Sequence, residues 1–349
     1  MSTTYRSISW NPNKRRYDLV AVSTIVAFLV MVTALQAALR PELTIETLLI
    51  RALGAAAFTL LQVILCIGPL SRLDRRFLPL LYNRRHLGVM MFTLAFAHGL
   101  FSIVQFHTGG TLNPLVSVLV SNDRYGTIAQ LPFQPFGLAA LMILFVMAAT
   151  SHDFWLHNLT APVWKALHMC VYGAYALILS HVMFGVFQGE ISRILGWALC
   201  AGVLTVFTLH LVAARHEAMR DRENTNVKKD GFVDVCAVDE IPEKRAVVTC
   251  LSGERVAVFR YDGRISAISN VCQHQNGPLG EGRIVNDCVV CPWHGYEYQP
   301  ATGASPAPFT EKVPTFDVRV RAGRVLVHPQ PHAPGTRVEP AVLIEARTA

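Results

Sequence analysis

The stretch NVCQHQNGPLGEGRIVNDCVVCPWHGYEY, Asn270 to Tyr298, decides the fold of the C-terminal part of the chain. It holds two short boxes, Cys272-x-His274 and Cys291-x-x-His294, with sixteen residues between them. Two thiols and two imidazoles also suit zinc, but the cysteines of a zinc finger pair together and so do its histidines. Because each box here mixes one cysteine with one histidine, the spacing favours a different metal centre.

The mixed boxes resemble those of the Rieske [2Fe–2S] family, and the resemblance covers about residues 231–328. In that family two cysteines hold one iron and two histidines hold the other. The resemblance therefore implies that Cys272 and Cys291 bind the first iron, while His274 and His294 bind the second.

Departures from the Rieske pattern concern the surroundings of the cluster. High-potential members carry a disulfide between the two cluster loops, at positions that hold Gly277 and Trp293 here. A serine that bonds a bridging sulfur is replaced by Tyr296, whereas Tyr298 keeps the place of a tyrosine that reaches a ligand sulfur. Since hydrogen bonds to sulfur raise the potential, we expect a lower-potential, ferredoxin-like cluster. We interpret Cys288 as a buried, reduced thiol rather than an extra ligand.

The composition indicates a membrane protein. Of the 349 residues 52% are hydrophobic and 16% are charged, which is too apolar for a soluble chain of this length. Six apolar stretches have the length of a membrane span, at residues 19–39, 47–69, 87–107, 132–150, 166–187 and 193–214. The net charge of +7 comes from basic residues beside these stretches, so we expect a lipid bilayer and no nucleic acid as the partner.

The basic residues also predict the orientation. Ten of them lie in two segments, between the second and third stretches and after the sixth: Arg72, Arg75, Arg76, Arg84 and Arg85, then Arg215, Arg220, Arg222, Lys228 and Lys229. The opposite loops carry far fewer. By the positive-inside rule, both termini of this multi-pass protein are cytoplasmic, and we expect it in the cell (inner) membrane.

After the last span the pattern changes to short β-type runs separated by turn signals such as Ser252-Gly253 and Asp262-Gly263. The predicted fold is therefore a membrane all-α six-helix bundle plus a small all-β Rieske domain. We expect a cytoplasmic N-terminus, the transmembrane domain, an exposed linker, the Rieske domain and a poorly ordered, proline-rich tail, at residues 1–18, 19–215, 216–230, 231–328 and 329–349.

Histidines inside apolar spans are candidates for function. His168 and His181 are thirteen residues apart, about 20 Å along a helix, which suits two stacked hemes. The segments RRHLGVMMFTLAFAH, ending at His98, and WKALHMCVYGAYALILSH, ending at His181, resemble the ferric-reductase-like transmembrane family over about residues 50–215. The resemblance implies b-type heme, with His98 and His181 flanking the outer one.

The second ligand of an inner heme, opposite His168, is harder to assign from the sequence. His86 lies at a comparable depth and is interpreted as this ligand, with a solvated interfacial histidine as the alternative and His210 as the second candidate. The alternative for the whole set is helix-packing histidines that hydrogen-bond across the bundle. The sequence leaves open whether one heme or two is bound.

These features predict an oxidoreductase or the electron-transfer subunit of one. We expect single electrons to pass from a cytoplasmic donor, a ferredoxin or flavoprotein reductase, through the cluster and heme to an acceptor on the far side. The alternatives are a quinol- or heme-linked donor to a soluble cytoplasmic oxygenase, and a redox sensor subunit. A Rieske oxygenase is disfavoured, because only about twenty residues follow the Rieske-like part and cannot hold the two-histidine, one-carboxylate iron domain.

Overall fold

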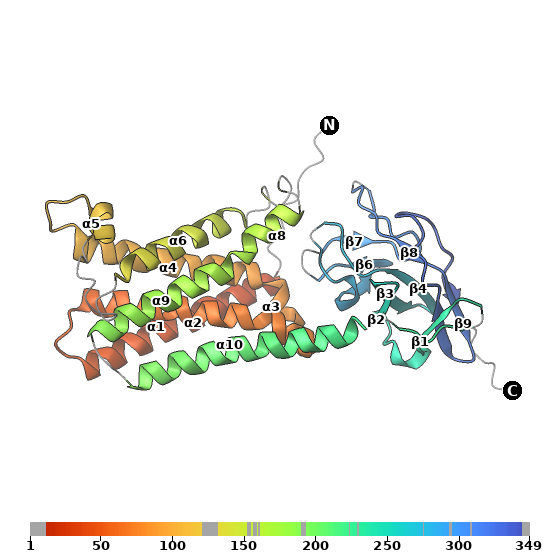
Figure 1. The fold of residues 1–349 in the computed structure, drawn as a ribbon, viewed down its shortest axis with the longest axis horizontal. Helices are drawn as coiled ribbons and strands as arrows, with labels where there is room; N and C mark the ends of the chain where they lie inside the picture. Colours follow the sequence, from red (N-terminus) through yellow and green to blue (C-terminus); the bar gives the residue numbers. More distant parts are fainter. Residues whose placement is uncertain are drawn as a thin grey trace. The chain divides into compact units, whose positions relative to one another are not determined.

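The computed structural model describes residues 12–120, 132–151, 155, 159, 161–189, 193–222, 224–228, 230–274, 276–292, 295–307 and 309–343. The chain divides into two compact units, residues 1–68 with 83–210 and residues 69–82 with 211–349. The first unit is helical and the second contains the β-sheets (Figure 1).

The longer helices follow the predicted apolar stretches: α1 (Pro12–Leu39), α2 (Ile45–Leu73), α4 (Arg84–His107), α6 (Gln134–Ala149), α8 (Ala161–Met169), α9 (Val171–Gly189) and α10 (Arg193–Arg220). Shorter elements are η1 (Arg75–Phe77), α3 (Leu78–Tyr82) and α5 (Pro114–Val120). Many of their leucine, valine and phenylalanine side chains face outward, which is the pattern of helices surrounded by lipid.

Among the described residues, five helical segments are long and apolar enough to cross a membrane: Arg15–Leu39, Ile45–Leu73, Arg84–His107, Val163–Gly185 and Gly196–Met219. The remaining predicted span is α6, which has only 16 residues and is about 24 Å long, against about 30 Å of hydrocarbon. The predicted six-span count is thus five long helices and one shorter apolar helix. Residues 121–131, which precede α6, lie outside the described residues.

The predicted β-type runs form antiparallel strands. The hairpin turns Ser252-Gly253 and Asp262-Gly263 have positive φ at all four residues, as the tight turns of twisted hairpins require. The largest sheet has the order β11-β4-β3-β2, with β8 also paired to β4. Its strands are β2 (Arg245–Leu251), β3 (Glu254–Tyr261), β4 (Arg264–Ser269), β8 (Thr315–Phe316) and β11 (Ala341–Val342).

Two smaller sheets complete the second unit. One has the order β1-β10-β9, and the other, β5-β6-β7, carries the second metal-type box between its last two strands. The strands are β1 (Val233–Ala237), β5 (Arg283–Val285), β6 (Cys288–Val290), β7 (Glu297–Tyr298), β9 (Val318–Arg321) and β10 (Arg324–Val327). Short helical turns η3 (Val238–Glu240) and η4 (Leu279–Glu281) follow β1 and the first box.

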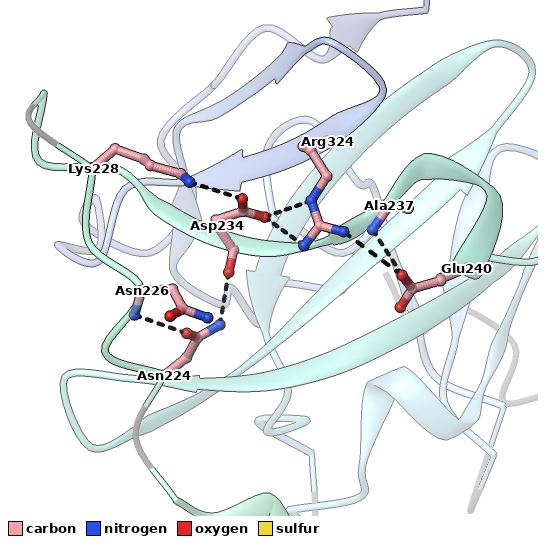
Figure 2. A network of polar contacts seen from close by, with 7 residues as sticks. All are labelled: Asn224, Asn226, Lys228, Asp234, Ala237, Glu240 and Arg324. Atoms are coloured by element: carbon pink, nitrogen blue, oxygen red, sulfur yellow. Dashed lines mark hydrogen bonds and ion pairs between the residues drawn. The ribbon is translucent and has the colours of Figure 1, made fainter.

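The segment predicted as an exposed linker is partly structured. Helix α10 continues to Arg220, so the first five linker residues are helical. The following residues, 224–228, contact Asp234 of β1. Lys228 Nζ lies 3.1 Å from the Asp234 carboxylate, and the Asn224 side-chain amide donates to the Asp234 main-chain carbonyl at 3.0 Å (Figure 2). Arg324 of β10 completes the network at 2.8 Å. Charge complementarity therefore fixes the connector to the edge of the β1 sheet.

The tail, expected to be poorly ordered, packs on the β unit as far as residue 343. Strand β11 pairs with β4 through Ala341 and Val342, and the N–H of Val338 donates to the carbonyl of Ala301 at 2.8 Å. The proline-rich part of the tail packs against the β unit through main-chain hydrogen bonds. The amino-acid composition does not reveal such bonds.

Candidate metal and heme sites

The first metal-type box lies in a loop after β4 that is closed by its own main chain. The N–H of Cys272 donates to the carbonyl of Gly277 at 2.9 Å, and the N–H of Asn276 donates back to the carbonyl of Cys272 at 2.7 Å. Asn276 takes the left-handed conformation, with φ of 58°. The loop therefore holds its cysteine in a fixed position.

The second box repeats this construction between β6 and β7. Cys291 donates to the carbonyl of Tyr296 at 2.8 Å, and Gly295 donates back to Cys291 at 2.9 Å. Gly295 has φ of 73°, the same left-handed conformation as the equivalent residue of the first loop. Two equivalent loops thus present the two cysteines.

The donor set of the boxes fits an iron–sulfur cluster by its chemistry. Cys272 and Cys291 are each 1% exposed, lie in one buried cluster and are reduced thiols, while His274 is partly exposed. The fourth predicted ligand, His294, lies outside the described residues. Within the described part of the chain, no three His, Cys, Asp or Glu side chains gather into a metal site.

Tyr298 reaches the sulfur of Cys272, one of the predicted cluster ligands. Its hydroxyl lies 3.4 Å from Sγ of Cys272 and accepts the N–H of Gln273 at 3.1 Å. Burial, and then the neighbouring Cys272, raise the pKa of the Tyr298 phenol. The hydroxyl therefore keeps its proton and can donate it in a hydrogen bond to the sulfur.

Tyr296, which stands in place of the serine, serves the histidine side of the site. Its ring stacks on the imidazole of His274, with centroids 4.8 Å apart and an angle of 9°. Its hydroxyl donates to the carboxylate of Glu311, and the centroid of its ring lies 4.9 Å from that of Phe309. Tyr296 therefore directs its hydroxyl to a carboxylate, and Glu311 and Phe309 are site residues that sequence reasoning missed.

Cys288 belongs to β6, next to the second box. The side chain is 8% exposed, and its strand position pairs with Val285. Burial raises the pKa of the Cys288 thiol, so it stays protonated at neutral pH. A protonated thiol is a poor metal ligand, in keeping with its interpretation as a core residue.

The helical unit brings together two of the predicted heme histidines. The rings of His98 on α4 and His181 on α9 have centroids 6.2 Å apart, at an angle of 81°. A bond from a metal to an imidazole nitrogen is about 2 Å, and the ring centre lies roughly 1 Å beyond it, so two rings on one metal are about 6 Å apart. The observed spacing fits one iron between the two rings.

Each ring is also oriented by a main-chain carbonyl on another segment. Nδ1 of His98 lies 2.9 Å from the carbonyl of Ile50, and Nδ1 of His181 lies 2.9 Å from that of Phe133. Histidine ligands commonly give their second nitrogen to such an acceptor, which fixes the tautomer. These bonds leave Nε2 of both rings as the nitrogen for a metal.

Comparison with known families agrees with this geometry. Residues 53–179 match the family described as ferric reductase like transmembrane component, and residues 231–317 match the Rieske [2Fe-2S] domain. The chain thus carries a ferric-reductase-like transmembrane domain and a Rieske [2Fe–2S] domain. The first match includes His98 and His168 and ends two residues before His181, and the second includes all four residues of the metal-type boxes.

Similarity to individual proteins concerns the Rieske domain. The alkene monooxygenase ferredoxin component of Xanthobacter autotrophicus is 31% identical over 101 residues, 29% of this chain and 83% of the relative. The anthranilate 1,2-dioxygenase ferredoxin subunit of Burkholderia cepacia is 33% identical over 93 residues, 26% of this chain and 86% of that protein. A solved ferredoxin of carbazole 1,9a-dioxygenase from Nocardioides aromaticivorans is 28% identical, with a TM-score of 0.27, over 28% of this chain and 98% of that one.

The two families establish the cofactors. The Rieske domain carries a [2Fe–2S] cluster, and the ferric-reductase-like domain binds heme b. Together with the apolar helices, they make the chain a multi-pass membrane electron-transfer protein that works with redox partners in a lipid bilayer.

His168, in the ferric-reductase-like domain, contacts Trp164 and Ser151. Its Nδ1 lies 3.0 Å from the carbonyl of Trp164, and its ring stacks on the Trp164 indole at 3.8 Å. Nε2 lies 3.4 Å from the hydroxyl of Ser151. The imidazole is therefore oriented by Trp164 of its own helix, and its second nitrogen lies near Ser151 of another segment.

The two predicted partners of His168 have other neighbours in the described residues. Nδ1 of His86 lies 2.9 Å from a carboxylate oxygen of Asp18 on α1, which leaves its Nε2 for another group. His210 has both nitrogens engaged, by the carbonyl of Val206 at 2.8 Å and the hydroxyl of Tyr172 at 3.0 Å. Of the two, His86 fits a ligand role better.

Proposed function

We propose that this protein passes single electrons between the Rieske cluster and heme b, towards an acceptor on the far side of the membrane. The observation that carries the proposal is the pair His98 and His181, whose rings are 6.2 Å apart in a chain that also has a Rieske domain. The cluster is held by Cys272, His274, Cys291 and His294, and the outer heme is held by His98 and His181.

When bound, the cluster and the heme supply one-electron chemistry, and the chain's own residues prepare their sites. The carbonyls of Ile50 and Phe133 hold both axial imidazoles in one tautomer. The Tyr298 hydroxyl donates to Cys272 and so stabilises negative charge on its sulfur. The apolar helices keep water away from the histidines of the bundle.

The proposed direction of transfer is outward. Basic residues flank the ends of α2, α4 and α10, and the positive-inside rule puts that side, with both termini, in the cytoplasm of a cell (inner) membrane protein. The donor is then a cytoplasmic ferredoxin or flavoprotein reductase. The acceptor is ferric iron, oxygen or a partner reductase outside.

An inner heme on His168 is part of the proposal, with His86 as the second ligand. The free Nε2 of His86, oriented by Asp18, supports this role. Replacing His86 by Ala is expected to halve the heme-to-protein ratio if two hemes are bound. A heme-to-protein ratio equal to the parent's would show that His86 is not a heme ligand.

A second candidate function is electron donation to a soluble oxygenase, with the bundle as the oxidant of quinol. The relatives of the Rieske domain favour it, because they are ferredoxin components of oxygenase systems. In that case electrons reach the cluster from the heme. The order of the two potentials separates the candidates, since a cluster more negative than the heme favours outward transfer.

The proposal is tested with the full chain in vesicles that expose the Rieske domain. A reduced ferredoxin is added, and heme reduction is followed by absorbance at the α band. We expect heme reduction in the parent and none in Cys272→Ser, whose heme content is intact. Heme reduction at an unchanged rate in Cys272→Ser would overturn the path through the cluster.

A further inference from the structure

The two histidines of the outer heme have equivalent surroundings, each of which is called a seat below. The carbonyl that accepts from His98 belongs to Ile50, four residues before Gly54 on α2. The carbonyl that accepts from His181 belongs to Phe133, four residues before Gly137 on α6. Each seat thus consists of one carbonyl and, one helical turn later, one glycine.

A constant offset relates the two seats along the chain. The differences 181 − 98, 137 − 54 and 133 − 50 all equal 83. The segments FTLAFAHGLFSIVQ (92–105) and YALILSHVMFGVFQ (175–188) share a leucine, the histidine, a phenylalanine and a glutamine at the same places. GAAAFTLLQV (54–63) and GLAALMILFV (137–146) share five of ten residues in the same way.

Burial follows the same offset. Leu61 on α2 is 1% exposed, and its equivalent Leu144 on α6 is 3% exposed. The helix pairs α2/α4 and α6/α9 are therefore two copies of one structural element, and each copy contributes one histidine. The same offset places Arg85 at the position equivalent to His168. His98 and His181 are therefore the one pair of equivalent histidines that includes a predicted heme ligand from each copy.

Each glycine lies against the imidazole that its neighbouring carbonyl orients. A Cβ on Gly137 would lie 2.6 Å from Nδ1 of His181, and a Cβ on Gly54 would lie 3.0 Å from Nδ1 and Cε1 of His98. Each ring is fixed by its Nδ1 bond to the carbonyl one turn earlier, so it cannot move aside without losing that bond. A side chain at Gly137 therefore displaces the imidazole of His181, and one at Gly54 presses more mildly on that of His98.

We propose that Gly54 and Gly137 are positioning residues that set the distance between the two axial imidazoles of the outer heme. The inference rests on the proposed function, in which His98 and His181 hold that heme. The glycines act through the histidines, and the element they belong to occurs twice because the heme needs one imidazole from each side.

The test compares four single variants of the full-length protein in detergent. Gly54→Ala and Gly137→Ala fill the seats, while Gly88→Ala on α4 and Gly173→Ala on α9 are controls, because a Cβ there meets no atom within 4 Å. Heme affinity is measured by titrating heme into protein prepared without it. The axial ligation is read from the EPR signal of the oxidised heme.

We expect heme affinity to fall roughly five- to a hundredfold in Gly137→Ala, with high-spin heme in place of the low-spin form, and less in Gly54→Ala. Both controls keep the parent values. The Rieske signal of the same samples shows that the second unit has folded, and the helical content from circular dichroism reports on the first unit. If Gly137→Ala misfolds, the milder Gly54→Ala decides the question through its EPR signal.

Parent affinity and an unchanged low-spin signal in the folded seat variants would overturn the inference and leave the proposed function intact. An equal loss in the two control variants would also overturn it, because the effect would then come from packing in general. Failure of the proposed function is recognised separately, since His98→Ala and His181→Ala would then keep the parent number of low-spin hemes per chain.

Discussion

The hydroxyl of Tyr298 lies 3.4 Å from Sγ of Cys272, while the hydroxyl of its neighbour Tyr296 donates to Glu311. Two tyrosines, two residues apart, thus divide the surroundings of the cluster site. One contacts Cys272 through its hydroxyl, and the other contacts His274 through its ring. Their different partners lead to different expectations for the cluster potential.

Replacing Tyr298 by Phe is expected to lower the midpoint potential of the cluster. A hydrogen bond to the sulfur stabilises the reduced cluster, and the substitution removes that bond. We expect a fall of up to about 59 mV, a tenfold change for one electron, in a redox titration followed by EPR. Tyr261→Phe is the control, because that hydroxyl bonds Ser266 instead. An unchanged potential in Tyr298→Phe would contradict the role of the hydroxyl.

Glu311→Gln is expected to raise the potential. Burial raises the pKa of Glu311, but hydrogen bonds from Tyr296 and from main-chain N–H groups outweigh it, so the pKa lies below its ordinary value and the carboxylate is charged at pH 7. Reduction adds a negative charge nearby, and removing the carboxylate charge makes reduction easier. Tyr296→Phe removes the hydrogen bond but not the carboxyl group and serves as the comparison. A potential in Glu311→Gln equal to the parent's rules out this electrostatic effect.

Cys288→Ala is expected to keep the cluster and to lower the stability of the Rieske domain. Removing the buried sulfur leaves a small cavity, at a cost of about 1 kcal/mol. Iron content and the EPR spectrum should match the parent, whereas Cys291→Ser should lose both. Loss of iron from Cys288→Ala would show that its sulfur takes part in binding.

Asp234→Asn tests the network that fixes the connector. Hydrogen bonding by Arg324 is the main cause that lowers the pKa of Asp234 below 3.8, with Lys228 contributing. A depressed pKa stabilises the fold above the ordinary pKa, and this stability is lost as the pH falls through the folded value. We expect Asp234→Asn to cost about 1 kcal/mol at pH 7 and less as the pH falls below 3.8. Chemical denaturation at several pH values measures the difference, and a constant difference would contradict the assignment.

Sequence reasoning performed best where the signal is local. The β-type runs and the Ser252-Gly253 turn depend on neighbouring residues, and they became strands and a hairpin. The contact of Tyr298 with a ligand sulfur was also predicted, because the family pattern fixes its position.

What was missed depends on residues far apart in the chain. Glu311 reaches Tyr296 across fifteen residues, and Gly137 reaches His181 across forty-four. No local pattern marks either one, since a glutamate in a loop and a glycine in an apolar helix are both common. The packing of the tail was missed because main-chain pairing leaves little trace in composition.

The doubled element of the helical unit has a consequence for assembly. Since each copy carries one of the two histidines of the proposed outer heme site, neither copy completes that site alone. A ligand that binds only the assembled form shifts the equilibrium towards that form. Heme bound between His98 and His181 therefore links the two halves of the bundle, and a chain whose halves fail to meet in the bilayer lacks the outer heme.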